Sequence, residues 1–87
     1  MKIKKGFVAK EIAGQHVVVA LGAASKIFNG IIKLNDSGKL IWDMLAEGAE
    51  QEQIVDALLS EYEVDRDTAE RDVNNFIEQL KGANILE

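Results

Sequence analysis

The spacing of the apolar residues changes once along this 87-residue chain, close to Asn35. Before that point, short runs of apolar and β-branched residues are separated by glycines and polar residues, which is typical of strands. After it, apolar residues recur at the helical period of about 3.6 residues. A chain whose strands all precede its helices predicts an α+β fold, in which a layer of helices covers one face of an antiparallel sheet.

The first part of the chain predicts three strands. The expected spans are 7–12, 16–21 (HVVVAL) and 28–34 (FNGIIKL). Gly14-Gln15 offers a tight turn between the first two strands. We expect a loop at 22–26, where the residues are small and polar. Gly30, inside the third span, indicates a bulge or the close approach of another backbone.

The second part of the chain predicts three helices. The first is expected after a cap at Asn35 or Asp36 and ends at Gly48, and the second spans about 50–62. The third is expected to start after a cap at Asp65 or Asp67 and to end near Gly82. Beyond it, Ile85-Leu86 is expected to fold back as an apolar plug.

Composition and length place limits on the class of protein. Apolar residues make up 47% of the chain and charged residues 29%, which is typical of one globular domain, here spanning residues 1–87. The chain has no cysteine, no signal peptide and no apolar run near the ~20 residues that cross a bilayer, so we expect a cytoplasmic protein.

Charge is distributed unevenly along the sequence. The formal net charge is −5, which disfavours a nucleic-acid binder, because phosphate contacts need clustered lysine and arginine. Residues 1–33 contain six lysines and a single acid, Glu11, whereas the acids gather from Asp36 onward. This asymmetry could orient a partner electrostatically, or it could simply reflect two solvated faces.

The residues of the usual catalytic and metal sites are missing. His16 is the only histidine, it lies in an expected strand, and no nucleophile motif accompanies it. Without cysteine and with one histidine, no recognisable set of metal ligands remains. Trp42 is interpreted as a packing residue of the first helix. We therefore expect no enzyme activity, no cofactor and no metal.

The exposed edge of the sheet is the remaining candidate for function. A three-stranded sheet has two edges with unpaired N–H and C=O groups, and an extended peptide can add to such an edge as a further strand. Residues 27–33 mix polar and apolar side chains around Gly30. Alternatively, Lys26 and Lys33 guard a plain edge, because lysine is a common edge protector.

The segment 30–42, GIIKLNDSGKLIW, resembles the "LN…G..IW" signature of the coenzyme PQQ synthesis protein D (PqqD) family. Further matches follow at the spacing of that family, and the resemblance spans about residues 17–86. They are Gln53 to Leu58, Tyr62, Asp72-Val73, Phe76, Leu80 and Ile85-Leu86. The segment 20–29 departs from members of the PQQ pathway and looks more like the broader PqqD-like group.

The resemblance implies a winged helix-turn-helix-like domain that recognises ribosomally made precursor peptides. Such proteins bind the leader segment of the precursor and present it to a modifying enzyme, often of the radical SAM type. The leader adds beside the third strand and packs against the third helix. The implied peptide-binding residues are Phe28, Asn29, Gly30, Ile31, Ile32, Lys33, Asp72, Val73, Phe76 and Gln79.

Two other functions stay open from the sequence. A winged-helix topology suggests DNA binding, although the third helix carries more acids than bases. A general protein-docking adaptor is the second alternative. The oligomeric state is expected to be a monomer or a weak dimer, because a free strand edge can also pair with a second copy of the chain.

Overall fold

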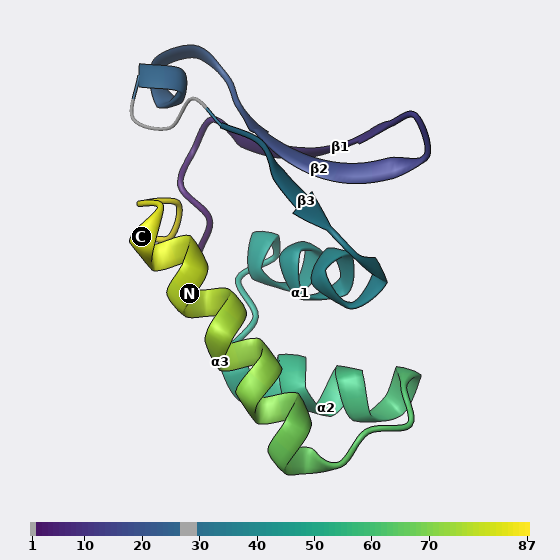
Figure 1. Ribbon diagram of the computed structural model, residues 1–87. Helices are drawn as coiled ribbons and strands as arrows, with labels where there is room; N and C mark the ends of the chain where they lie inside the picture. The colour runs from purple at the N-terminus through teal and green to yellow at the C-terminus, as the bar shows by residue number, and fades with distance from the viewer. Residues whose placement is uncertain (1, 27–29) are drawn as a thin grey trace.

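The computed structural model describes residues 2–26 and 30–87. Three strands are followed by three α-helices, and a short 3-10 helix, η1, lies between the second and third strands (Figure 1). The elements are β1 (Phe7–Ile12), β2 (Gln15–Ala20), η1 (Gly22–Lys26), β3 (Ile32–Leu34), α1 (Asp36–Ala46), α2 (Gln51–Glu61) and α3 (Arg66–Gly82). The helices lie on one side of the sheet, which confirms the predicted α+β architecture and its order.

The sheet is antiparallel throughout, with β2 in the centre and strand order β1-β2-β3. Ile12 pairs with Gln15, so the two residues of the turn are Ala13 and Gly14. The predicted turn at Gly14-Gln15 was therefore wrong by one residue. Both turn residues have positive φ, 53° at Ala13 and 80° at Gly14, as a type I′ turn requires.

The turn residue Ala13 offers a route to a more stable protein. An alanine at positive φ is strained, whereas asparagine tolerates this conformation and Asn-Gly is a favoured pair in type I′ turns. We expect Ala13→Asn to raise the free energy of unfolding by about 0.5–1 kcal/mol. Thermal unfolding followed by circular dichroism should show a midpoint higher by roughly 2–8 °C. An unchanged or lower midpoint would contradict a strained turn at this position.

Two further differences from the sequence prediction lie between β2 and β3. The segment expected to be a loop forms η1, held by the Ala24 N–H donating to the Leu21 carbonyl and by the Ser25 hydroxyl donating to the Gly22 carbonyl. The third strand is shorter than the expected 28–34, because β3 covers only Ile32–Leu34. Residues 27–29 lie outside the described residues.

The starts of α1 and α3 follow capping residues that the sequence predicted, whereas the cap of α2 was not predicted. The Asn35 side chain accepts a hydrogen bond from the Gly38 N–H at 2.8 Å and caps α1. Glu50 and Gln53 form a capping box at α2. Of the two aspartates considered for α3, Asp65 is the cap, and its side chain accepts from the Thr68 N–H at 2.7 Å. Hydrogen bonds from the Thr68 side chain and from its backbone N–H lower the pKa of Asp65 below its ordinary value.

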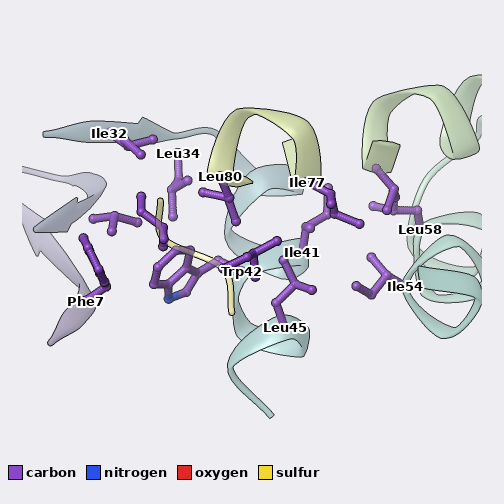
Figure 2. Close-up of a cluster of buried hydrophobic side chains, with 14 of the residues drawn as sticks. Phe7, Ile32, Leu34, Ile41, Trp42, Leu45, Ile54, Leu58, Ile77 and Leu80 are labelled. Atoms are coloured by element: carbon purple, nitrogen blue, oxygen red, sulfur yellow. The ribbon is translucent and has the colours of Figure 1, made fainter. Parts of the chain in front are cut away.

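The core lies between the sheet and the helices and extends between the helices themselves. Figure 2 shows Trp42 between Phe7 of the sheet and the α1 side chains Ile41 and Leu45. Trp42 is buried, which confirms its interpretation as a packing residue. The inner face of the sheet contributes apolar residues that alternate along each strand, as the period of two requires. They are Phe7, Val18, Ile32 and Leu34.

The two ends of the described chain meet beside α3. Ile3 and Leu86 form an antiparallel bridge, and the Lys4 N–H donates to the Ile85 carbonyl at 2.8 Å. Ile85 and Leu86 are buried in the core cluster, so the predicted apolar plug is confirmed. Within the part of the chain that the structure describes, no helix is both long and apolar enough to cross a membrane.

Candidate functional site

The outer edge of β3 is available for pairing. β3 pairs with β2 through Val18↔Ile32, Val17↔Lys33 and His16↔Leu34. Among the described residues, no strand pairs with its other side. The row of backbone groups along that side is therefore the place where an added strand could form hydrogen bonds.

The register identifies which backbone groups of β3 point outward. The Leu21 N–H donates to the Gly6 carbonyl at 2.6 Å, and in an antiparallel ladder, pairs that exchange hydrogen bonds alternate with pairs that do not. By this alternation, the backbone groups of Val17 and Val19 form their hydrogen bonds with β1. The backbone groups of His16 and Val18 therefore form theirs with β3.

The same alternation then assigns the groups of β3 itself. Ile32 and Leu34, which face Val18 and His16, use their backbone groups inside the sheet. Lys33, and Ile31 directly before the strand, must point their N–H and C=O groups away from β2. These two residues therefore form the open edge.

A groove runs from the hairpin end of the sheet along α3, and we name it the strand–helix groove. Its first part is lined by Lys33 and Leu34 of β3, His16 of β2, and Phe76 and Gln79 of α3. It continues past the N-terminus of α1, where the same two α3 residues are joined by others. Asn35 and Gly38 line both parts, and the second part adds Ser37, Ile41, Asp72 and Asn75.

The strand-to-helix motif builds the floor of this groove. Leu34 is buried, and Asn35 next to it caps α1. Gly38 lies in the first turn of α1, where an added Cβ would meet Asn35 Oδ1 at 3.0 Å and the Phe76 ring at 3.5 Å. A side chain at this position would crowd both the cap and the ring. The glycine thus lets α3 approach the start of α1.

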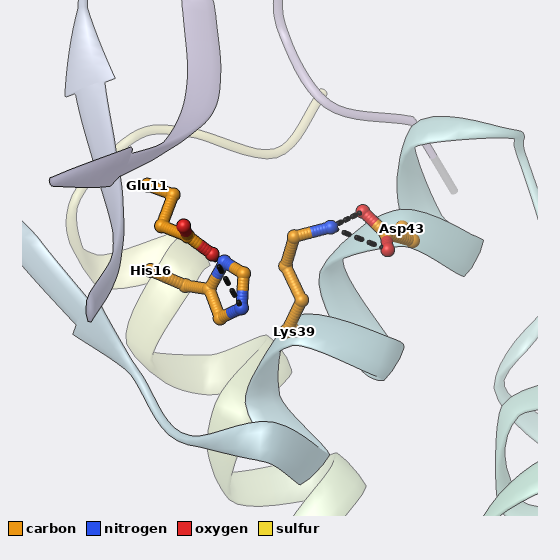
Figure 3. A network of polar contacts seen from close by, with 4 residues as sticks. All are labelled: Glu11, His16, Lys39 and Asp43. Atoms are coloured by element: carbon orange, nitrogen blue, oxygen red, sulfur yellow. Dashed lines mark hydrogen bonds and ion pairs between the residues drawn. The ribbon is translucent and has the colours of Figure 1, made fainter. Parts of the chain in front are cut away.

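Charged residues of both signs lie in and around the groove. At the hairpin end, His16 Nε2 lies 3.9 Å from Glu11 Oε1 (Figure 3). Lys33 of β3 is exposed. Lys39, near His16 in the same view, donates to both carboxylate oxygens of Asp43 at 2.7 and 2.6 Å. Asp36 lines the hairpin part of the groove together with His16, and Asp72 lines the part beside the start of α1; both carboxylates are exposed.

The structure brings together residues of the two segments that the sequence singled out. Lys33, Asp72, Phe76 and Gln79 line the strand–helix groove, and Ile31, directly before β3, is 62% exposed. The side chains of Ile32 and Val73 belong to the core. Gly30 is exposed. Phe28 and Asn29 lie outside the described residues.

Several lining residues were not among the sequence-based candidates, among them His16, Asn35 and Asn75. His16 reaches the groove because it pairs with Leu34, a relation that appears only when the register of the sheet is known. Asn35 was considered only as a cap. Asn75 lies one residue before Phe76, on a part of α3 whose exposed face the apolar spacing does not orient uniquely.

Residues 15–86 match the sequence profile described as coenzyme PQQ synthesis protein D (PqqD). The chain belongs to the PqqD family. The match begins at the first residue of β2 and includes β3, all three α-helices and the C-terminal plug. It therefore covers both walls of the groove. None of the curated proteins matches the chain.

Two solved structures share the fold of this PqqD-family protein over nearly its whole length. One is described as TbiB1 in complex with the TbiA(beta) leader peptide, with 37% identity, a TM-score of 0.81, and coverage of 100% of this chain and 95% of that one. The other is lasso peptide synthetase B1 complexed with the leader peptide, with 26% identity and a TM-score of 0.80. It covers 99% of this chain and 95% of the other.

Proposed function

We propose that residues 1–87 act as one peptide-recognition domain, which binds the leader segment of a ribosomally made precursor peptide and presents it to a modifying enzyme. The leader adds as a strand to the open edge at Ile31 and Lys33. Its side chains on the inner side enter the strand–helix groove against Phe76 and Gln79. The proposed contact set also includes Phe28, Asn29, Gly30 and Asp72.

The observation that carries this proposal is the open edge beside a groove. Lys33 belongs to both features, because its backbone groups point outward from the sheet and it also lines the strand–helix groove. Backbone hydrogen bonds can hold any extended segment, and a neighbouring groove can select among side chains. Membership of the PqqD family supports the same function, as do the two similar proteins solved with leader peptides.

We propose a role in binding and not in catalysis. The groove lacks a nucleophile held by a histidine, since its histidine, His16, lies near Glu11. Among the described residues, no group of three or more candidate ligands could hold a metal ion. We place this role in the cytoplasm, where ribosomally made precursors first appear. That the enzyme is of the radical SAM type stays a prediction.

A titration of isotope-labelled protein with a leader peptide tests the proposal. The probe is a synthetic peptide of the leader segment of a precursor encoded beside this chain. We expect a dissociation constant in the micromolar range or below, about −8 kcal/mol or better. Amide shifts should concentrate on residues 30–33 and on the α3 residues that line the groove.

A peptide of the same composition in scrambled order is the matched control. It keeps the charge and length of the leader but places the wrong side chains against the groove, so we expect at least tenfold weaker binding. Shifts confined to α2, or equal binding of both peptides, would count against leader recognition at this site.

A further inference from the structure

The face of the sheet that points away from the helices carries a defined pattern of side chains. Side chains alternate along a strand, and Phe7, Val18 and Ile32 point into the core, so their neighbours point to the opposite side. We name this opposite side the outer sheet face. It consists of Val8, Lys10 and Ile12 of β1, Gln15, Val17 and Val19 of β2, and Ile31 and Lys33.

The outer sheet face is apolar and basic. Val8 pairs with Val19, and Ile31 extends this row at the β3 edge. In the next row, Val17 lies between Lys10 and Lys33 and is only 5% exposed. Ile12 and Ile31 are 52% and 62% exposed, which places them among the most exposed large apolar side chains of the described chain. An apolar surface that stays in water is typical of an interaction site.

Charge complementarity indicates what would cover this face. None of the described residues on it is acidic, and its two lysines lie on either side of a valine. A partner with an apolar patch and carboxylates on its rim would bury Val8, Val19 and the two isoleucines while pairing with both lysines. A second copy of the chain fits less well, because a symmetric contact would place the lysines of both copies in one interface.

A bound leader would extend the same face. Residues of an added antiparallel strand that lie opposite Ile31 and Lys33 must point their side chains to the same side as these two residues. The intervening residues of that strand would point toward the groove. The outer sheet face would therefore gain a fourth strand, composed of substrate side chains.

We propose that the outer sheet face, completed by the bound leader, is the surface on which the modifying enzyme docks. The inference rests on the proposed leader recognition and adds the partner's contact surface, an apolar patch rimmed by acidic side chains. Because the leader forms part of this surface, leader and enzyme bind with positive coupling. The enzyme then distinguishes the loaded protein from the empty one, and by linkage it tightens leader binding by the same factor.

Binding measurements on four variants test the docking surface. The probe is the modifying enzyme encoded beside this chain, titrated against the protein with and without saturating leader peptide. We expect the leader to raise the affinity for the enzyme by about tenfold. Lys10→Glu and Ile12→Thr alter the outer sheet face on β1, two strands away from the leader edge. Each should weaken enzyme binding at least tenfold and change leader binding less than twofold.

Matched substitutions away from this face serve as controls. Lys81→Glu makes the same charge change at the end of α3, and Val64→Thr removes an exposed apolar side chain before α3. Both should leave enzyme binding within twofold of the unsubstituted protein. Circular dichroism of all four variants checks that the fold is kept.

Several results would overturn the docking surface. One is enzyme binding that neither β1 variant alters, and another is a loaded protein that does not bind the enzyme. A third is a β1 variant that still binds the enzyme but no longer self-associates or no longer binds phosphatidylglycerol vesicles. The outer sheet face would then serve a second copy of the chain or a lipid surface and not the enzyme. If the protein fails to bind the leader peptide in the first place, the proposed function fails, and that result is visible before any enzyme is added.

Discussion

Replacing Ile31 with proline is expected to weaken leader binding by about 10- to 100-fold while leaving the fold intact. Proline has no N–H, so a carbonyl of the bound leader would be buried without a partner, at a cost of about 1–3 kcal/mol. The Ile31 N–H points away from β2, and proline is tolerated in a sheet where the missing donor faces the open edge. Isothermal titration calorimetry with the leader peptide measures the loss.

Ile31→Ala is the matched control for this prediction. It removes the exposed side chain but keeps the backbone donor, so binding through the backbone should weaken no more than severalfold. If alanine and proline reduce the affinity equally, the side chain of Ile31 dominates the contact and the backbone pairing is contradicted. A thermal midpoint that falls sharply for the proline variant alone would instead place the Ile31 N–H inside the sheet.

Leu45→Ala is expected to destabilise the protein more than any surface change discussed here. Leu45 is fully buried on α1, near Ile41 and Trp42, so its truncation leaves a cavity between the sheet and the helices (Figure 2). Comparable substitutions cost roughly 3–5 kcal/mol, a large share of the stability of a domain of this size. The thermal midpoint should fall by at least about 12 °C. Chemical denaturation followed by tryptophan fluorescence also reports the loss, through Trp42.

Leu21→Ala makes the same chemical change at a partly exposed site. Leu21 is 47% exposed, so its truncation removes fewer contacts and should cost less than about 1 kcal/mol. Equal losses at both positions would mean that α1 does not pack against the core as described.

The helices could be predicted from the sequence because their signals are local. An apolar stripe fixes the buried face, and a capping side chain acts within its own first turn, as Asn35 does through the Gly38 N–H at 2.8 Å. The choice between Asp65 and Asp67 needed the structure, since both are chemically suited to the cap. The arrangement of three strands before three helices followed from the change of period alone.

The details of the sheet depended on contacts distant in sequence. Ala13 is a poor residue for positive φ, so the turn was predicted one position too late, and only the pairing of Ile12 with Gln15 locates it. The same register brings His16 to the groove and orients Lys33 outward. Val73 and Phe76 share an apolar stripe, yet Val73 is fully buried and Phe76 reaches the groove, a difference that helical spacing cannot resolve.

The shortness of the open edge limits what the backbone can contribute to affinity. Ile31 and Lys33 together offer four outward groups, two N–H and two C=O. Four hydrogen bonds at about 0.5–1.5 kcal/mol each supply about 2–6 kcal/mol, whereas a micromolar complex needs about 8 kcal/mol. Side chains entering the groove must therefore supply the remainder. An extended segment lacking suitable side chains would dissociate rapidly, so this small edge discriminates among peptides although its own hydrogen bonds are indifferent to sequence.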